Sequence, residues 1–272
     1  MQYDPVKDRL GRFFSGRPSL QKGFYRLLDL FFLRAWFVHR EVRRLLGKHP
    51  AGRPIDVLDA GTGFGQYAYF IARHFAHAHI LAVDVKQDYL DNARAFFDRT
   101  RLAGRVDFAR EDLTDLKAKG PFDFILSVDV MEHIEDDRAV FRHFARVLRQ
   151  GGHVLINTPS DLGGSDVGRE GEPSFIEEHV RDGYNLHELK EKLRSAGLTP
   201  VRSLYTYGRF GSLAWRLLIK YPILMLDKSL VMLLLLPFYY LPVLPLGLVL
   251  HALDVRGENK VGTGVLVIAE KP

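Results

Sequence analysis

The stretch from Asp56 to Gly65 constrains the fold more than any other part of this 272-residue chain. It reads Asp-Val-Leu-Asp-Ala-Gly-Thr-Gly-Phe-Gly, so an apolar run typical of a buried parallel strand leads directly into alternating glycines. Glycine adopts positive φ readily and lets a ligand approach the backbone. Residues 66–75 then continue with helical spacing, and a helix that begins after such a turn offers its first amide groups to a ligand. The sequence therefore predicts one half of a nucleotide-binding βα unit.

The glycine spacing separates two classes of nucleotide-like cofactor. The dinucleotide fingerprint is Gly-x-Gly-x-x-Gly, whereas this chain has Gly-x-Gly-x-Gly with Asp59 two residues before the first glycine. A carboxylate at Asp59 would repel a pyrophosphate, but it suits a ligand that carries an ammonium and a sulfonium group. These residues resemble motif I of the class I S-adenosylmethionine-dependent methyltransferases. The resemblance implies a doubly wound α/β fold and S-adenosylmethionine as the cofactor.

Further acids fall where this resemblance requires them. Asp84 ends an apolar segment 25 residues after Asp59, close to the offset at which an acid meets ribose hydroxyls in such folds. Glu111 and Asp112 follow the next strand-like segment, where the family commonly places an acid near the adenine amino group, and Asp112 is the preferred of the two. The resemblance implies these cofactor-binding residues: Asp59, Gly61, Thr62, Gly63, Gly65, Asp84, Val85, Glu111, Asp112 and Asp129.

A compact cluster of ionisable residues follows the fourth predicted strand. Asp129, Glu132 and His133 form an Asp-x-x-Glu-His pattern, which resembles the Glu-x-x-Glu-His of the ubiquinone-biosynthesis O-methyltransferases, where the trio holds a divalent cation. Two carboxylates and an imidazole suit such an ion, although Asp in place of Glu shortens the reach. Two other roles stay open, namely a wall of the cofactor pocket and His133 as a general base. The resemblance also places His179 and Arg181 on the substrate side of the cleft.

Alternating apolar segments and helical stretches predict the rest of the fold. This alternation is typical of a parallel sheet with helices on both faces. Strands are expected near 55–59, 79–84, 105–108, 122–128 and 152–157. Asn185 and Glu188 form a capping-box pattern that begins a further helix. By the resemblance, residues 199–207 and 262–270 close a seven-stranded, mostly parallel sheet as an antiparallel pair.

The first 54 residues are basic and aromatic. They contain 12 Lys and Arg against 4 Asp and Glu, a difference of +8, whereas the whole chain carries +5. Bulky apolar side chains alternate with cations through a predicted helix from about Ser19 to Leu46, which fits a core-packed helix or lid as well as a helix at a membrane surface. We therefore divide the chain into a basic, aromatic helical extension, 1–54, and a methyltransferase domain, 55–272.

A hydrophobic insertion, 208–261, separates the last two predicted strands. It has no charged side chain from Ser229 to Leu253, a stretch long enough to cross a membrane. Both ends must return to one soluble sheet and three prolines interrupt the stretch, so a hairpin that dips into one leaflet, an apolar cover over the active site or a dimer interface fits better. Aromatic residues expected at the level of the lipid headgroups are Trp215, Tyr221, Tyr239 and Tyr240.

The combined features predict methyl transfer from S-adenosylmethionine, with O-methylation favoured, to a hydrophobic or lipid-like acceptor such as a quinone precursor, a polyene or a phenolic lipid. The chain has no cysteine, which excludes disulfides and thiolate metal sites, and it shows no nucleic-acid-binding module. We expect a cytoplasmic protein that is peripheral or monotopic on the cytosolic face of a membrane, with a homodimer left open. Two other functions remain open as well: an NAD(P)-dependent oxidoreductase and a non-catalytic scaffold that binds a membrane or a partner.

Overall fold

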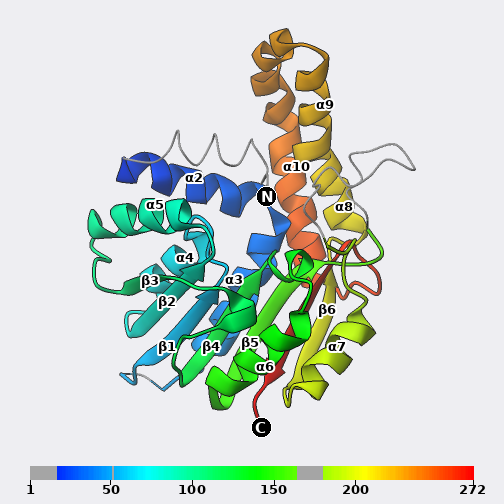
Figure 1. Cartoon of the computed structure of the whole chain (residues 1–272). Coiled ribbons are helices and arrows are strands. Elements are labelled where there is room, and N and C mark those ends of the chain that lie inside the picture. Colours follow the sequence, from blue (N-terminus) through cyan, green and yellow to red (C-terminus); the bar gives the residue numbers. More distant parts are fainter. Residues whose placement is uncertain (1–16, 51, 164–179) are drawn as a thin grey trace.

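The computed structural model of the chain describes residues 17–50, 52–163 and 180–272. Seven strands form one sheet in the order β3-β2-β1-β4-β5-β7-β6 (Figure 1). Strands β1 to β5 are parallel, and β7 runs antiparallel between β5 and β6. The strands are β1 (Ile55–Ala60), β2 (Ala78–Asp84), β3 (Val106–Arg110), β4 (Phe122–Val128), β5 (Leu148–Pro159), β6 (Thr199–Thr206) and β7 (Gly264–Glu270). The predicted fold class is confirmed, including the antiparallel pair that closes the sheet.

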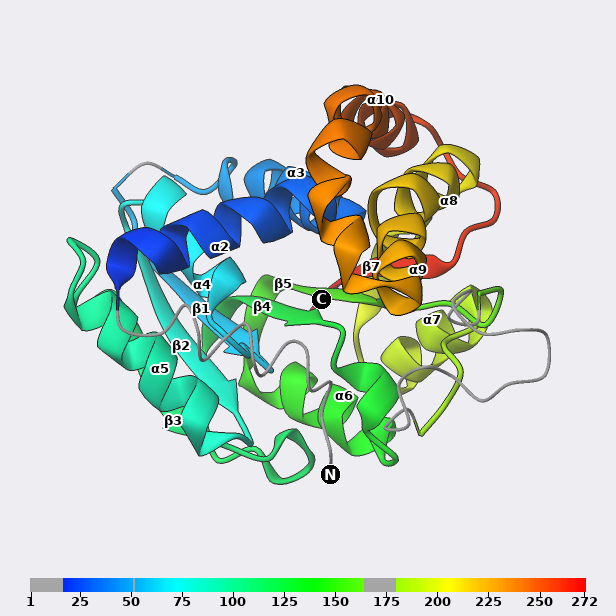
Figure 2. The ribbon, with the colours of Figure 1, turned by 90° about the horizontal axis from the view of Figure 1, so that it is seen from above.

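Helices cover both faces of this sheet (Figure 2). The helices that the structure describes are α2 (Pro18–Phe31), α3 (Leu33–Leu46), α4 (Gln66–His74), α5 (Gln87–Asp98), α6 (Asp137–Val147), α7 (Leu186–Ser195), α8 (Arg209–Trp215), α9 (Tyr221–Lys228) and α10 (Leu236–Arg256), with short turns η1 (Leu113–Asp115), η2 (Met131–His133), η3 (Arg216–Lys220, a π-helix) and η4 (Leu230–Leu234). Helices α2 to α5 share one buried cluster with the sheet, and α6 and α7 share the other. In β1, Val57 belongs to the first cluster and Leu58 to the second, which explains why this strand is apolar on both faces.

All five parallel strands end at one edge of the sheet, which we call the carboxyl edge. The glycine-rich loop leaves β1 at this edge. The register also brings the hydrophobic insertion there, because Gly264 at the start of β7 lies between Pro159 at the end of β5 and Thr206 at the end of β6. The insertion between β6 and β7 therefore leaves and re-enters the sheet at the same edge as the loop that should hold the cofactor.

The single helix predicted from Ser19 to Leu46 is instead two helices, α2 and α3. Phe32 interrupts them with an extended backbone, φ −100° and ψ 111°. The break turns the chain, so both helices bury aromatic side chains: Tyr25 of α2 is 1% exposed and Phe37 of α3 is fully buried. These rings supply core contacts between the basic extension and the sheet, as the core-packed alternative predicted.

The hydrophobic insertion forms a helical hairpin that projects beyond the body of the molecule (Figure 1). One arm runs through α8, η3 and α9, and the other is α10. The predicted hairpin is therefore present, but its turn lies at 229–235 rather than at the prolines. Pro237 occupies the first turn of α10, where a missing N–H is harmless, and Pro242 and Pro245 lie inside an uninterrupted helix.

Candidate active site

The glycine-rich loop has the backbone conformation that its sequence predicts. Gly61, Gly63 and Gly65 have φ values of 83°, 52° and 79°, all in the left-handed region that favours glycine. A Cβ atom at Gly61 would collide with the Val130 side chain, whereas the space beside Gly63 is open. Gly65 is the N-cap of α4, so the loop delivers the start of this helix to the carboxyl edge. The loop conformation thus allows a ligand to approach its backbone closely.

Asp59 is buried directly under this loop. Its side chain accepts a hydrogen bond from the Thr62 hydroxyl at 2.6 Å. The pKa of Asp59 is raised to about 6, chiefly by burial; the Thr62 hydrogen bond opposes this rise and the nearby Asp84 carboxylate adds to it. A positively charged ligand group close to Asp59 would favour its ionised form.

Asp84 connects the end of β2 to the glycine-rich loop. One carboxylate oxygen accepts from the Gly63 amide at 2.9 Å and the other from the Lys86 amide at 3.0 Å. A carboxylate offers about four acceptor positions, so hydrogen bonds from two ribose hydroxyls remain compatible with these contacts. The next residue, Val85, leaves 48% of its side chain exposed and provides an apolar surface at the same edge.

Glu111 and Asp112 are engaged within their own loop. Asp112 caps η1 by accepting from the Thr114 amide at 2.8 Å and from its hydroxyl at 2.7 Å. Glu111 accepts from the Lys117 amide at 2.8 Å. Both acids lie after β3 at the carboxyl edge, and their predicted role at the adenine group stays a prediction.

Helix α2 holds the glycine-rich loop from outside, a role that the sequence did not reveal. The Tyr25 hydroxyl donates to the Phe64 backbone carbonyl, and the side-chain amide of Gln66 donates to the Asp29 carboxylate at 2.7 Å. Tyr25 is buried, and this burial raises the pKa of its hydroxyl well above the usual range. The alternating aromatic residues of the basic extension predicted that it packs against the domain, but they did not reveal that it contacts the glycine-rich loop.

Asp129 is paired with Arg34, another residue that the sequence left unassigned. Asp129 follows β4 with a positive φ of 52°, and its carboxylate lies 2.9 Å from the Arg34 guanidinium. The Arg34 amide donates to the Tyr207 hydroxyl at 3.2 Å, which links α3 to the end of β6. The Tyr67 hydroxyl is buried nearby, and its pKa rises through burial despite the adjacent Arg34 cation. A polar cluster thus lies next to the glycine-rich loop.

The structure does not bring together the metal ligands that the sequence predicted. Glu132 is 1% exposed, turns inward and accepts from the Thr158 hydroxyl at 2.9 Å. The Glu132 carboxylate and the His133 ring nitrogen are 3.9 Å apart, while the Asp129 carboxylate pairs with Arg34. Within residues 17–50, 52–163 and 180–272, no group of three or more His, Asp or Glu side chains converges on a point that could hold an ion. Burial, reinforced by the Asp129 charge, raises the pKa of Glu132 to about 8.

Arg181 is held in a buried ion-pair cluster. Its guanidinium pairs with Asp137, donates to the Ile134 carbonyl at 2.6 Å and lies 4.8 Å from the centre of the Tyr184 ring. Asp137 also pairs with Lys192 at 2.7 Å. These contacts give Arg181 a structural role between α6 and α7, and its predicted contact with substrate stays a prediction. His179 lies outside the described residues.

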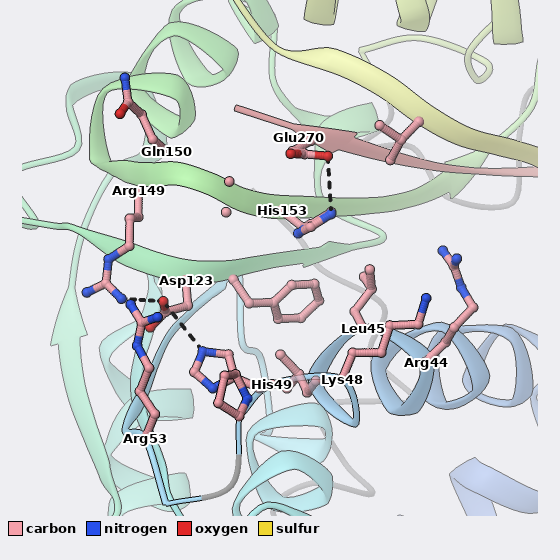
Figure 3. Close-up of a pocket in the computed structure, with 16 residues that line it drawn as sticks. Arg44, Leu45, Lys48, His49, Arg53, Asp123, Arg149, Gln150, His153 and Glu270 are labelled. Atoms are coloured by element: carbon pink, nitrogen blue, oxygen red, sulfur yellow. Dashed lines mark hydrogen bonds and ion pairs between the residues drawn. The ribbon is translucent and has the colours of Figure 1, made fainter. Parts of the chain in front are cut away.

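A hollow of about 540 Å³ lies at the other end of the sheet (Figure 3). Asp123 at the start of β4 and Glu270 at the end of antiparallel β7 mark it as the amino end of the parallel strands. Its ionisable side chains largely face partners: Arg149 pairs with Asp123, and His153 lies 3.7 Å from Glu270. We therefore assign the candidate site to the carboxyl edge, where the glycine-rich loop and the strand-end acids meet.

Comparisons with known proteins identify methyltransferases as similar proteins. Residues 57–152 match a protein family described as a methyltransferase domain. The chain is 34% identical over 155 residues to phosphoethanolamine N-methyltransferase 1 of Triticum aestivum, covering 53% of this chain and 28% of that protein. It is 30% identical over 158 residues to the ubiquinone biosynthesis O-methyltransferase of Xanthomonas axonopodis pv. citri, covering 55% and 64%.

Solved structures support the fold. Phosphoethanolamine N-methyltransferase 2 of Haemonchus contortus, in complex with S-adenosylhomocysteine, superposes with a TM-score of 0.55 at 20% identity, over 87% of this chain and 53% of that one. The chain spans less than two thirds of the length of each curated relative described above. The family match ends at residue 152, so the helical hairpin lies outside it.

Proposed function

We propose that this chain is a class I, S-adenosylmethionine-dependent methyltransferase, which the match of residues 57–152 to a methyltransferase domain supports. It transfers a methyl group from S-adenosylmethionine to a hydrophobic, lipid-like acceptor at a membrane surface. One observation carries the proposal: the glycine-rich loop and the apolar hairpin leave the sheet at the same edge. A cofactor bound at the loop and the apolar hairpin would therefore lie on the same side of the sheet.

The residues at the carboxyl edge fit the cofactor. The glycine-rich loop would receive its methionine end, Asp84 would accept from its ribose hydroxyls and Asp112 would lie near the adenine. When bound, the sulfonium supplies a methyl group activated for in-line displacement. The protein then contributes mainly by holding the acceptor at near-attack distance and by excluding water.

His133 is the proposed base for an acceptor hydroxyl. It follows β4 at the carboxyl edge, and its ring lies 3.9 Å from Glu132. With a pKa of about 8, Glu132 is protonated at neutral pH, so it places no full negative charge beside the imidazole. Imidazole is a common general base, so the His133 ring could accept the proton that an O-methylated acceptor must lose.

The hairpin favours an apolar acceptor over a phosphoethanolamine-like one. The ubiquinone biosynthesis O-methyltransferase of Xanthomonas axonopodis pv. citri supports O-methylation of a quinone-type ring, whereas the wheat relative is named for N-methylation of a small polar compound. An apolar arm next to the site serves the first kind of substrate and has no use for the second. We place the protein on the cytosolic face of the membrane.

The test uses isotope-labelled S-adenosylmethionine and a total lipid extract. We expect label in an organic-soluble product whose mass has increased by one methylene, together with S-adenosylhomocysteine. Binding of S-adenosylhomocysteine without any labelled product from lipids or quinols would leave a cofactor-binding scaffold instead. Tight binding of NADH, with no binding of S-adenosylhomocysteine, would instead identify the protein as an NAD(P)-dependent oxidoreductase.

A further inference from the structure

The exposed side of α10 is apolar over its whole length. Its outward positions recur every three to four residues, as expected for one face of a helix. We define the outer face of α10 by Phe238, Leu241, Pro242, Pro245, Leu246, Val249 and Leu253. Phe238 is 74% exposed and Leu241 78%, values unusual for large apolar side chains.

The opposite side of α10 explains why the outer face has no partner within the described residues. Gly247 packs against Leu218 of η3, and the His251 ring lies 5.4 Å from that of Trp36 in α3. Asp254 accepts from the Gly211 amide at 2.9 Å. These contacts fix the helix by its inner side. Only 17% of its most apolar 18-residue window is buried, so α10 is not a core helix, although it is long and apolar enough to cross a bilayer.

The turn of the hairpin extends this apolar surface. Its exposed side chains are Val231, Leu233, Leu234 and Leu235. A contiguous apolar surface of this kind marks a site of interaction, because soluble monomers rarely expose one.

The charges of the hairpin lie on its other arm and at its base. The insertion 208–261 contains six Lys and Arg against three Asp and Glu, and the exposed cations include Arg216, Lys228 and Arg256. An apolar face beside a basic one is the pattern of a helix that lies in a membrane interface. Anionic headgroups would attract these cations.

Two prolines of α10 favour the interfacial region of a bilayer over its hydrocarbon core and over a tightly packed dimer interface. Pro242 and Pro245 have no N–H, so the Phe238 and Leu241 carbonyls lack their usual helical donors. The hydrocarbon core and a tightly packed dimer interface would both leave these carbonyls without water. The interfacial region of a bilayer supplies water while it accepts the apolar side chains.

We propose that the outer face of α10 and the turn at 231–235 dock on a phospholipid bilayer, with the hairpin lying in the interface rather than crossing it. This inference rests on the proposed function and deepens it, because it names the surface that brings the carboxyl edge to the membrane. A lipid-embedded acceptor would then meet the site without leaving the membrane environment.

Co-sedimentation of the full chain with vesicles tests the surface. The vesicles are phosphatidylcholine alone and phosphatidylcholine with phosphatidylglycerol, at low and high salt. We expect binding to both, stronger with phosphatidylglycerol and weakened by salt. The variant Phe238→Gln/Leu241→Gln/Leu246→Gln should bind at least tenfold more weakly. The control, Leu27→Gln/Leu162→Gln/Val201→Gln, changes three exposed apolar side chains away from the hairpin, at 49%, 54% and 49% exposure, and should bind as the wild type does.

Two further measurements separate the outcomes. Calorimetry with S-adenosylhomocysteine should give the same affinity for all three proteins, and loss of cofactor binding in the wild type would refute the proposed function rather than the docking surface. Sedimentation velocity without vesicles reports a dimer. Wild-type protein that does not bind either vesicle type overturns the proposal, and a dimer that the hairpin variant dissociates would assign the surface to a second copy of the chain.

Discussion

At the residue scale, Asp84 has two proposed roles. Its carboxylate orders the glycine-rich loop through the Gly63 and Lys86 amides, and it is the proposed acceptor for the ribose hydroxyls. Asp84→Asn keeps one acceptor oxygen, so it retains one of the two backbone hydrogen bonds and loses both the other one and the charge. Hydrogen bonds to a charged group contribute about 1.5–3 kcal/mol.

We therefore expect the Asp84→Asn variant to bind S-adenosylhomocysteine at least about tenfold more weakly, which corresponds to about 1.4 kcal/mol. Asp107→Asn, an exposed acid on the neighbouring strand β3, is the control and should leave the affinity unchanged. Isothermal titration calorimetry measures both. Equal affinities in the two variants would remove Asp84 from the cofactor site.

Glu132 predicts a pH dependence of stability. Its pKa is about 8 in the folded protein and near 4.5 when solvated, so between these values the folded state holds a proton that the unfolded state has lost. Stability must then fall as the pH rises through this window, by up to about 1.4 kcal/mol per pH unit. Asp59, with a pKa of about 6, acts in the same direction only at the lower end.

Glu132→Gln keeps a side chain of similar shape and removes this titration. We expect its free energy of unfolding to change less than that of the wild type from about pH 6 to about pH 8. Urea denaturation at several pH values gives the slopes, with the neighbouring Glu135→Gln as control. A wild-type stability that rises over this interval, or a variant with an unaltered slope, would show that Glu132 is ionised in the fold.

At the element scale, periodicity predicted strands and caps better than it predicted breaks. Strand β1 was predictable because both of its faces are buried, and Asn185 caps α7 as its sequence indicated, accepting from the His187 amide at 2.9 Å. The break at Phe32 was not predictable, because no proline or glycine marks it; the buried rings of Tyr25 and Phe37 lie on either side of it in the chain.

The site shows the same division between local and distant information. Local sequence placed Asp59 and Asp84 correctly at the carboxyl edge, since each directly follows or ends an apolar strand. Arg34 could not be found in this way, because its partner Asp129 is 95 positions further along the chain. The spacing of Asp129, Glu132 and His133 suggested a metal, but spacing does not reveal that Glu132 turns inward to Thr158.

The two arms of the hairpin are joined by tyrosine hydrogen bonds that the sequence did not predict. Pro222 has no N–H, and the π-helical turn η3 directs the Tyr221 amide to the Arg216 carbonyl, so the Leu217 and Leu218 carbonyls lack helical donors. The Tyr239 and Tyr240 hydroxyls donate to these two carbonyls, each at 2.7 Å. The two hydroxyls therefore bond inside the hairpin, whereas the sequence placed them among lipid headgroups.

We expect Tyr240→Phe to loosen the hairpin by about 1–3 kcal/mol, because it leaves a carbonyl without its donor. Amides of α9 and α10 should then exchange with solvent at least about tenfold faster. Hydrogen exchange read by mass spectrometry locates the effect. Tyr221→Phe, which changes an exposed ring on the same hairpin, should leave the exchange rates as they are, and equal protection in both variants would contradict the role of Tyr240.

At the scale of the whole molecule, the hairpin divides into a base that belongs to the body and a distal part that does not. Arg40 of α3 donates to the Val255 carbonyl, and Gly211 and Asp254 join the two arms at the base. Removing the whole insertion would uncover α3, whose Arg34 pairs with Asp129 near the glycine-rich loop. A cut above Leu218 and Gly247, which pack against each other, leaves the base intact.

Replacing residues 222–246 by a short Gly-Ser linker should therefore preserve S-adenosylhomocysteine affinity within roughly twofold, about 0.4 kcal/mol. Every residue assigned to the cofactor lies in the body, and the exposed apolar side chains Phe238 and Leu241 leave with the deleted part. Calorimetry and a thermal unfolding scan check both statements, and methylation of an acceptor embedded in vesicles should be lost. Substantial loss of S-adenosylhomocysteine binding in a variant that unfolds at the wild-type temperature would instead mean that the distal hairpin closes over the cofactor, as a lid rather than a membrane contact.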